Sequence, residues 1–158
     1  EIDYIFEDKR MGTAGALGLL NERPSMPFVV MNGDLLTKVN MANLLDFHEK
    51  QKALATMCVR DYELQIPYGV IHVDKDRLTA IEEKPVMRYF VNAGIYVLSP
   101  DALDVIPKNE FYDMTTLFED LIKLKKDTSV FPVREYWMDI GKLEDYERAN
   151  GEFSKVFG

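Results

Sequence analysis

A mixed-sheet α/β sandwich is the fold class that the sequence predicts, and three observations support it. Continuous apolar runs at 27–32 and 53–60 are typical of strands that are covered on both faces. Apolar residues recur at helical spacing within 40–52, and polar residues occupy the opposite face. The alternating segments 68–74 and 77–84 predict an antiparallel hairpin. Strands that alternate with helices, together with this antiparallel insertion, indicate helices packed around a mixed sheet.

The remaining segments complete the predicted order of elements. Segment 89–99 is long, β-branched and aromatic, which favours a strand. Thr13 is an acceptable N-cap for a short helix that ends before Pro24. The other expected elements are a strand at 2–6, helices at 13–22, 101–106, 114–127 and 142–157, and two short strands within 128–140.

Composition bounds the class of protein. A chain of 158 residues fits one domain or part of one. The formal charge of −8 argues against nucleic acid as a partner, because phosphate binding needs a basic face. No apolar segment approaches the roughly 20 residues that cross a bilayer, so no membrane association is expected. The single cysteine, Cys58, lies in an apolar run, which predicts a buried thiol in a reducing compartment, the cytoplasm. His48 and His72 lack metal-ligand spacing and are interpreted as structural or surface residues.

Two aspartates follow predicted strands. Asp34 follows the buried run FVVMN through a glycine, and Asp139 follows an aromatic strand and precedes Gly141 and a helix. Ligands bind beyond the carboxyl ends of the strands in open α/β sheets. Carboxylates at two strand ends can share one Mg²⁺ ion, which takes oxygen ligands and keeps several waters. Each aspartate also has an ordinary alternative, which is turn chemistry for Asp34 and helix capping for Asp139.

Glycines at 12, 15 and 18 are spaced so that they would share one side of a helix and allow close packing. The same stretch would also leave bare backbone N–H groups at Gly12, Thr13 and Ala14 near a base, ribose or phosphate. It matches neither G-x-G-x-x-G nor a Walker loop. Both interpretations stay open on the residues alone.

Residues in the middle of the chain are further candidates for a binding site. In the segment IEEKP, Pro85 is expected to hold Lys84 extended beside Glu83, which suits a sugar phosphate. The alternative interpretation of IEEKP is an exposed, charged strand end without a binding role. Gly69 allows either close backbone approach or a turn. Asn92 stands inside a predicted buried strand, so it needs hydrogen-bond partners or a ligand.

The order of the motifs is itself informative. MGTAGAL, VVMNGDLL, YGV, IEEKP, VNAGIYVLSP and WMDIGKLEDYERAN follow one another over most of the chain. In this order they resemble the sugar-phosphate nucleotidyltransferases, the family of the glucose-1-phosphate thymidylyltransferases and mannose-1-phosphate guanylyltransferases. The resemblance implies a Rossmann-like α/β/α sandwich with a mixed sheet, the nucleotide-diphospho-sugar transferase fold. It also implies transfer of a nucleotidyl group from a nucleoside triphosphate to a sugar 1-phosphate, which gives an NDP-sugar and pyrophosphate.

The resemblance also implies roles for individual residues. Asp34 and Asp139 match the Mg²⁺-binding aspartates of the family, and Lys84 completes the implied catalytic set. Lys84 matches the position beside the sugar phosphate, and Glu83 matches the position beside sugar hydroxyls. The other implied substrate-binding positions are Gly12, Thr13, Ala14 and Gly15 beside the base and ribose, Gly33 in the turn before Asp34, and Gly69 and Asn92 around the sugar phosphate.

The sequence departs from the family at its start. The Gly-rich loop G-G-x-G-x-R-L-x-P, which cradles the triphosphate in the family, is absent, and so is the lysine that follows it. The chain also opens inside an apolar segment without an initiator methionine. We therefore expect a fold that is incomplete at the N-terminus. Residues 1–158 would be the C-terminal portion of a single nucleotidyltransferase domain, inactive alone and able to form a homo-oligomer through uncovered apolar faces.

Two other functions stay open. A nucleotide-dependent oxidoreductase would use a similar sheet, but no G-x-G-x-x-G follows a predicted strand. A non-catalytic relative would use the fold as a binding or assembly module, which the missing loop favours. The motifs do not fix the nucleobase or the sugar, although a guanylyltransferase acting on a mannose- or hexosamine-like phosphate is favoured.

Overall fold

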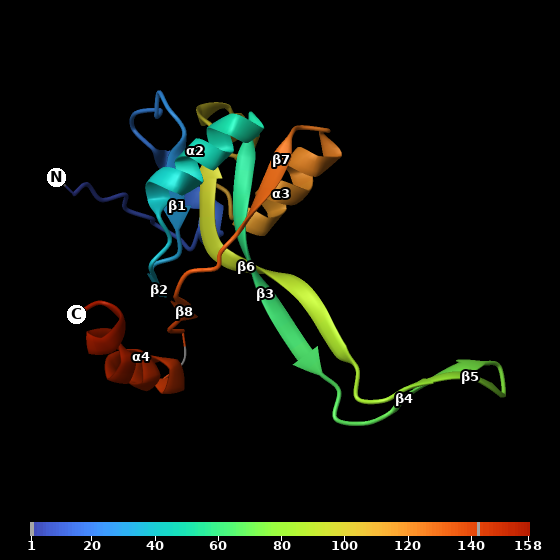
Figure 1. Cartoon of the computed structure of the whole chain (residues 1–158). Helices are drawn as coiled ribbons and strands as arrows, with labels where there is room; N and C mark the ends of the chain where they lie inside the picture. The colour runs from blue at the N-terminus through green and yellow to red at the C-terminus, as the bar shows by residue number, and fades with distance from the viewer. Residues whose placement is uncertain (1, 142) are drawn as a thin grey trace.

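The computed structural model describes residues 2–141 and 143–158, except for the side chain of Glu144. Its body is a four-stranded sheet with helices on both faces, and a two-stranded arm extends from one end of that sheet (Figure 1). With η denoting a 3₁₀ helix, the elements are α1 (Gly12–Gly15), η1 (Ala16–Leu19), β1 (Phe28–Met31), β2 (Leu35–Thr37), α2 (Met41–Gln51), β3 (Ala55–Gln65), β4 (Val70–Asp74), β5 (Arg77–Glu82), β6 (Val86–Leu98), η2 (Pro100–Val105), α3 (Met114–Lys123), β7 (Thr128–Pro132), β8 (Trp137–Asp139) and α4 (Leu143–Val156).

The central sheet is mixed, as the sequence predicts. Its strand order is β1–β6–β3–β7, in which β6 runs antiparallel to both β1 and β3 while β7 runs parallel to β3. Leu98 of β6 pairs with Phe28 on one side and with Ala55 on the other. The short strands β2 and β8 pair antiparallel, and β4 and β5 form the predicted hairpin.

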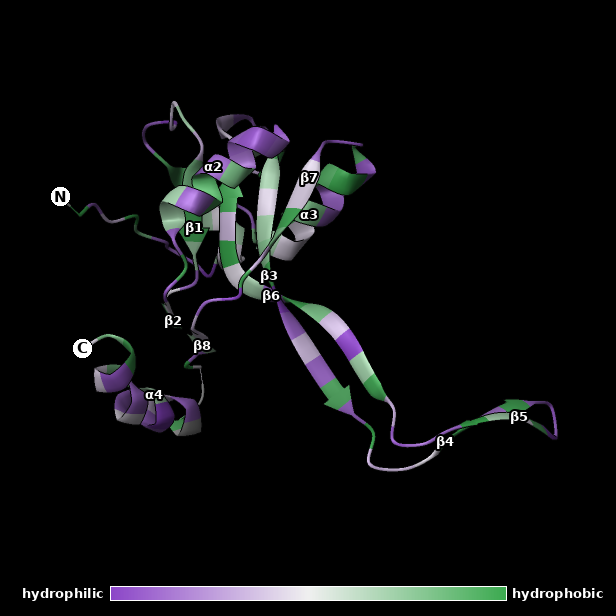
Figure 2. Cartoon of the chain, in the orientation of Figure 1, coloured by the Kyte–Doolittle hydropathy of each residue, from purple (hydrophilic) through white to green (hydrophobic). Residues whose placement is uncertain are grey.

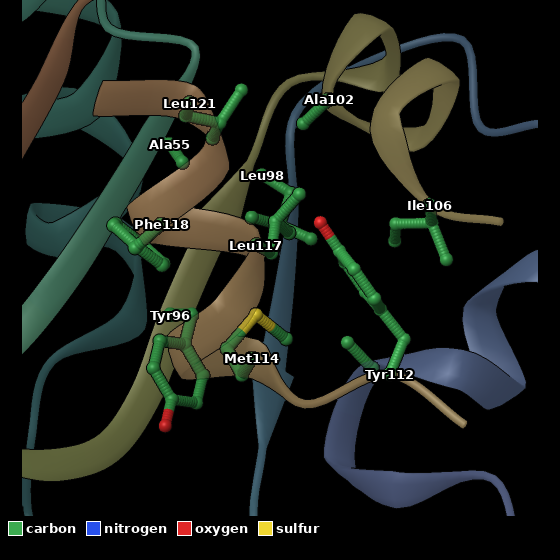
Figure 3. Packing of buried hydrophobic residues seen from close by; sticks show 11 residues of the cluster. Ala55, Tyr96, Leu98, Ala102, Ile106, Tyr112, Met114, Leu117, Phe118 and Leu121 are labelled. Carbon is green, nitrogen blue, oxygen red and sulfur yellow. The ribbon is translucent and has the colours of Figure 1, made fainter. Parts of the chain in front are cut away.

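Side chains of β6 alternate between two hydrophobic cores, one on each face of the sheet. Tyr96 and Leu98 belong to the core that contains α3 and η2, while Ile95 and Val97 belong to the core that contains α2. Figure 3 shows the first core, in which Leu117 of α3 packs in one cluster with Leu98. Helices therefore cover both faces of the sheet, which confirms the α/β/α sandwich.

Local sequence features explain the helices α2 and α3, which cover the sheet. The side chain of Asn40 accepts a hydrogen bond from the backbone N–H of Asn43 at 3.1 Å and caps the start of α2. Lys52, with a φ of 52°, ends this helix in the left-handed conformation. The apolar stripe of α3 repeats at helical spacing and is buried, and its members are Met114, Leu117, Phe118 and Leu121.

The arm is made of the second half of β3 and the first half of β6. Residues 60–65 pair antiparallel with 86–91, and the hairpin of β4 and β5 continues outward from them (Figure 1). Figure 2 shows hydrophobic and hydrophilic positions interleaved along the arm. Within the part of the chain that the structure describes, this ribbon has no covering layer, and nearly all of its residues are exposed.

The pairing register makes the arm two-faced, because directly paired residues of antiparallel strands point to the same side. Glu63 and Arg88 form one such pair, and their side chains make an ion pair at 2.8 Å. The opposite side is the apolar face of the arm, formed by the pairs Tyr62–Tyr89 and Leu64–Met87, which are 42% to 53% exposed.

Three local predictions differ from the structure. Segment 2–6 is not a strand, and Tyr4 and Phe6 are 90% and 84% exposed. Strand preference depends on packing against neighbouring strands, and no strand of residues 2–141 and 143–158 pairs with this segment. The helix expected over 13–22 divides into α1 and η1 and ends at Leu19. The segment 101–106 forms the 3₁₀ helix η2 rather than an α-helix.

Candidate active site

Asp34 and Asp139 are brought together by the pairing of β2 with β8. Strand β1 ends at Met31, and the chain turns before β2 begins at Leu35. Leu35 pairs with Asp139. The backbone N–H of Ile140 donates a hydrogen bond to the carbonyl oxygen of Asp34 at 2.8 Å. Both carboxylates therefore lie at one end of the β2–β8 pair, and both residues are exposed.

A bulge in β6 lies next to the β2–β8 pair. Met57 of β3 pairs with Tyr96, but Val59 pairs with Asn92, so β6 holds extra residues between these two points. Gly94 lies in the bulge with a φ of 69°, a left-handed conformation that favours glycine. The side-chain oxygen of Asn92 accepts a hydrogen bond from the backbone N–H of Gly94 at 2.9 Å. Bulges of this kind redirect side chains and are common beside active sites.

The bulge binds both segments that carry the aspartates. The carbonyl oxygen of Gly94 accepts a hydrogen bond from the backbone N–H of Asn32 at 2.9 Å, in the turn that leads to Asp34. The carbonyl oxygen of Ala93 accepts one from Nε1 of Trp137 at 2.7 Å, in the strand that ends at Asp139. A β-carbon at Gly94 would lie 2.9 Å from Nδ2 of Asn32, so the turn packs directly on this glycine.

A hollow of about 460 Å³ opens beside Asp34. It brings together three of the residues that the sequence singled out, because Thr13 of α1 lies across from Gly33 and Asp34. No heavy atom outside the chain neighbours of Gly33 lies within 4 Å of the point where its β-carbon would stand. The other lining residues are Val30, Met31 and Asn32.

The glycines at 12, 15 and 18 pack against the backbone of the segment 107–112. A β-carbon at Gly12 would lie 2.7 Å from the carbonyl oxygen of Tyr112, and one at Gly15 would lie 2.8 Å from that of Glu110. The corresponding distance from Gly18 to the carbonyl oxygen of Pro107 is 3.1 Å. Close packing, one of the two interpretations of these glycines, is confirmed.

The prediction of bare N–H groups in this stretch is wrong for Thr13 and Ala14. The N–H groups of Ala14 and Gly15 both donate to the carbonyl oxygen of Tyr112 at 2.9 Å, and that of Thr13 donates to Oδ1 of Asp113 at 3.0 Å. Thr13 is not the N-cap of its own helix either. Its hydroxyl oxygen accepts from the N–H of Met114 at 2.8 Å, so it caps the start of α3 instead.

Asn92 is exposed, so its expected position inside a buried strand is wrong. It pairs instead with neighbours in its own strand: its Nδ2 donates to the hydroxyl oxygen of Tyr96 at 2.7 Å, and its Oδ1 accepts from Gly94. Burial raises the pKa of Tyr96, which keeps the phenol protonated. The side chain of Asn92 therefore stabilises the bulge.

Gly69 and Glu83 lie together, but at a different place from the aspartates. A β-carbon at Gly69 would be 3.1 Å from Oε2 of Glu83, and the N–H of Ile66 donates to the carbonyl oxygen of Pro85 at 3.0 Å. These turns lie where the arm continues into the β4–β5 hairpin, away from β2 and β8 (Figure 1). The structure does not bring Lys84, which lies in the same turn, to the two aspartates.

The expected extended conformation of Lys84 is wrong. Strand β5 ends at Glu82, and Lys84 turns the chain toward β6 with a φ of 46°. Proline disfavours the right-handed helical region for the residue before it, but the left-handed region stays accessible and provides this turn. The Lys84 side chain is exposed.

Sequence reasoning missed the basic residues beside β8. Nη1 of Arg60 donates to the carbonyl oxygen of Glu135 at 3.0 Å, and its guanidinium lies 5.8 Å from the ring centroid of Trp137. Arg60 and Arg134 also line an open hollow of about 450 Å³. The sequence did contain a signal for these basic residues. Arg60 ends an apolar run, and Arg134 precedes the aromatic strand, in a chain that is acidic as a whole.

Two oxygen-donor side chains fit the Mg²⁺ ion that the resemblance implies. The point where a β-carbon of Gly141 would stand lies 3.1 Å from Oδ1 of Asp139 and 3.7 Å from Oδ2 of Asp34, so both carboxylates border one small space. Mg²⁺ is commonly held by one or two carboxylates, with water and phosphate oxygens in its other positions. No group of three or more His, Cys, Asp or Glu side chains forms a metal cage among the described residues.

The two histidines and the cysteine lie outside this site, as expected. His48 is buried, and its ring nitrogens lie 2.7 Å from the hydroxyl of Thr56 and 2.9 Å from that of Ser99. Burial lowers the pKa of His48 and raises the pKa of the Cys58 thiol to about 12, so Cys58 is an unreactive structural residue. His72 is exposed.

Comparison with known proteins identifies the family. The family model described as nucleotidyl transferase matches residues 1–155. The chain belongs to the nucleotidyl transferase family. The mannose-1-phosphate guanyltransferases of Candida albicans and Pichia angusta are 33% and 34% identical to this chain, over 92% of its length and 42% of theirs. The chain thus spans less than half the length of these curated relatives.

Solved structures support the fold of this chain. HddC from Yersinia pseudotuberculosis complexed with GMP-PN aligns with a TM-score of 0.64 at 23% identity, over 96% of this chain and 66% of that one. The same protein in another crystal structure aligns with a TM-score of 0.63 over 93% of this chain and 64% of that one. The mixed-sheet nucleotidyltransferase fold is therefore confirmed. None of the described helices is both long enough and apolar enough to cross a membrane.

Proposed function

We propose that the protein containing this chain transfers a nucleotidyl group from a nucleoside triphosphate to a sugar 1-phosphate. The observation that carries the proposal is the meeting of Asp34 and Asp139 across β2 and β8, beside a hollow that Thr13 and Gly33 also line. A phosphate oxygen of the sugar 1-phosphate forms a bond to the α-phosphorus. The bond from that phosphorus to the oxygen bridging the β-phosphate breaks, and pyrophosphate leaves with the electron pair.

Each site residue has a defined task in this proposal. Asp34 and Asp139 hold a Mg²⁺ ion, which when bound offsets the repulsion between two anionic substrates and polarises the reacting phosphate. The ammonium of Lys84 binds the sugar phosphate, and the carboxylate of Glu83 accepts hydrogen bonds from sugar hydroxyls. Gly69 lets the sugar approach the backbone. These arm residues must approach the β2–β8 pair in the active enzyme.

In this proposal the segment from Gly12 to Gly15 and the turn at Gly33 together bind the nucleotide. We propose that the segment from Gly12 to Gly15 contacts the base and ribose through its surface, since the N–H groups of its last three residues already donate to Tyr112 and Asp113. Gly33 leaves open space at the turn before Asp34. The exposed Asn92 acts from the bulge, at the border of the sugar site.

Residues 1–158 are proposed to form the C-terminal portion of a single nucleotidyltransferase domain that works in the cytoplasm, without nucleic acid or membrane partners. The net charge of −8 supports the first exclusion. The chain alone is proposed to be inactive, because it lacks the Gly-rich loop that cradles the triphosphate in the family. The named relatives make GTP and mannose 1-phosphate the first substrate pair to test.

Pyrophosphate release tests this function. The protein as its gene encodes it, and in parallel the 158-residue chain, would be incubated with four nucleoside triphosphates crossed with a panel of sugar 1-phosphates, with and without Mg²⁺. Release by the encoded protein that needs Mg²⁺ and one substrate pair is expected, with no release by the chain alone. Silence of the folded encoded protein across the panel would contradict the proposal.

One observation favours a second candidate, a non-catalytic binding or assembly module. The apolar face of the arm is exposed, and such faces mark interaction surfaces. An assembly module would self-associate through this face without any metal. We propose a homo-oligomer for either function, because the same face is present in both.

A further inference from the structure

Gly141 stands between the two aspartates, just after β8 ends. Its backbone N–H donates to Oδ1 of Asp139 at 2.9 Å, and the N–H of the residue before it, Ile140, donates to the carbonyl oxygen of Asp34 at 2.8 Å. These two hydrogen bonds tie the start of the β8–α4 connection to both aspartates. One bond thus reaches the carboxylate of Asp139 itself, and the other holds the connection against the backbone of Asp34.

Backbone conformation does not explain a glycine at this position. The described glycines with a positive φ are Gly12 and Gly94, so the φ of Gly141 lies outside the left-handed region that favours glycine. The φ of Gly141 therefore gives no reason for a glycine here. The reason for the glycine must lie in the space that a side chain would fill.

Ordinary close packing does not explain it either. At Gly12, Gly15 and Gly18 a β-carbon would run into the backbone of another segment. At Gly141, leaving aside its chain neighbours, the atoms within 4 Å of the β-carbon point are Oδ1 of Asp139 at 3.1 Å and Oδ2 of Asp34 at 3.7 Å. Among the described residues other than its chain neighbours, the space above Gly141 is thus bordered by two carboxylate oxygens.

We propose that Gly141 is a positioning residue that keeps this space open for a divalent cation and its water ligands. The inference rests on the proposed function, because it assumes that Asp34 and Asp139 share the metal. Mg²⁺ requires near-octahedral coordination at roughly 2.0–2.1 Å and keeps several waters, so its hydrated shell needs room beside the carboxylates. A methyl group at Gly141 would take that room and press on Oδ1 of Asp139.

Paramagnetic broadening of backbone amide signals by Mn²⁺, a cation that accepts the same oxygen ligands, tests this proposal on the 158-residue chain. In the unaltered chain, broadening is expected to centre on Asp34 and on 139–141. Gly141→Ala is expected to weaken the apparent Mn²⁺ affinity at these signals by at least about tenfold. The amide spectrum itself reports whether each variant is folded.

Gly151→Ala is the matched control, because no heavy atom of the described residues, apart from its chain neighbours and the backbone of its own helix, lies within 4 Å of its β-carbon point in α4. It should leave Mn²⁺ binding unchanged, while Asp34→Asn sets the level of lost binding. Equal Mn²⁺ binding by Gly141→Ala and the unaltered chain would overturn the role of Gly141 and leave the aspartates in place. Absence of Mn²⁺ binding at 139–141 in the unaltered chain would instead overturn the metal assignment itself. Failure of pyrophosphate release with Mn²⁺ binding intact would affect the proposed function alone.

Discussion

Single side chains in this molecule divide into those that hold the backbone and those that face the solvent at the candidate site. Trp137, Asn92 and Thr13 use their polar atoms on neighbouring backbone or side chains. The carboxylates of Asp34 and Asp139 border an open space, and Lys84 is exposed in its turn. Substitutions in the second group should change ligand binding far more than stability, because exposed side chains contribute little to the free energy of unfolding.

Lys84→Ala is expected to raise the KM for the sugar 1-phosphate in the encoded protein at least about tenfold, since it removes a charge-assisted contact to a phosphate. The KM for the nucleoside triphosphate should stay within about twofold. Steady-state kinetics with each substrate varied in turn measure both constants. A change confined to the triphosphate would contradict the role of Lys84, and Lys75→Ala in the hairpin turn is the control.

The buried His48 predicts a loss of stability in mild acid. Burial lowers the pKa of His48 in the folded chain below the ordinary value of 6.5. As pH falls through 6.5, the unfolded chain binds a proton that the folded chain does not, so the free energy of unfolding decreases by up to about 1.4 kcal/mol per pH unit. The decrease stops once the pH is below the folded pKa, and this group causes no change above the unfolded value.

Urea unfolding between about pH 7.5 and about pH 5.5 measures this dependence. His48→Gln should flatten the dependence over that range, because it removes the buried imidazole. The same slope in the unaltered chain and in His48→Gln would show that other groups cause it.

At the scale of elements, the β6 bulge is the feature that organises the site. It accepts hydrogen bonds from the turn before Asp34 and from the strand before Asp139, and it requires Gly94. Helices α2 and α3 could be predicted because their apolar stripes and the Asn40 cap are local signals. The bulge could not be predicted, because it depends on how β3 and β6 pair over a long sequence separation. The glycine in VNAGIYV was the local feature that indicated a bulge, because glycine inside a strand often marks one.

The wrongly predicted strand at 2–6 and the β2–β8 pair both show that local sequence does not determine strand pairing. The first segment has strand-forming residues but no partner strand in the part of the chain that the structure describes. The β2–β8 pair joins segments near residues 34 and 139, which are far apart in the sequence. The sequence indicated this pairing only because an aspartate follows a predicted strand at both places. Local pattern indicates which segments can form strands, while pairing decides which ones do.

Gly94→Ala is expected to destabilise the chain by about 2–4 kcal/mol. About 1–2 kcal/mol comes from the left-handed backbone at that residue, and the rest comes from the close contact with Asn32. Chemical unfolding gives the free energy, with Gly151→Ala in α4 as the control that should be neutral or slightly stabilising. A loss below about 0.5 kcal/mol would show that the bulge adapts without cost.

For the whole molecule, the body and the arm differ in how they are stabilised. The body has two cores around its sheet, whereas the arm exposes large apolar side chains, with Tyr and Leu–Met pairs on its apolar face and Val86 and Phe90 on the other face. Ile71, Val73, Leu78 and Ile81 of the hairpin are also 49% to 66% exposed. Together with the apolar face of the arm they offer on the order of 800 Å², about what each partner contributes to a standard-size interface.

The chain is therefore expected to self-associate through the arm, with the paired charges of Glu63 and Arg88 left on the solvent side. Leu64→Lys places a charge on the apolar face and should weaken association at least about tenfold. Gln65→Lys adds the same charge one residue later, on the opposite face, and should have little effect. Sedimentation velocity over a concentration series distinguishes them. A chain that stays monomeric throughout, or equal effects of the two variants, would contradict this surface.

The Mg²⁺ dependence of pyrophosphate release by the encoded protein and by its Asp139→Asn variant tests the central claim most directly. The substitution removes one carboxylate charge and keeps the shape of an exposed side chain, so the free energy of unfolding should change by less than about 0.5 kcal/mol. Release by the unaltered protein should require Mg²⁺, and the variant should lose at least about a hundredfold in kcat. A folded Asp139→Asn variant with near-normal, Mg²⁺-dependent release would contradict the assignment of Asp34 and Asp139 as the metal site.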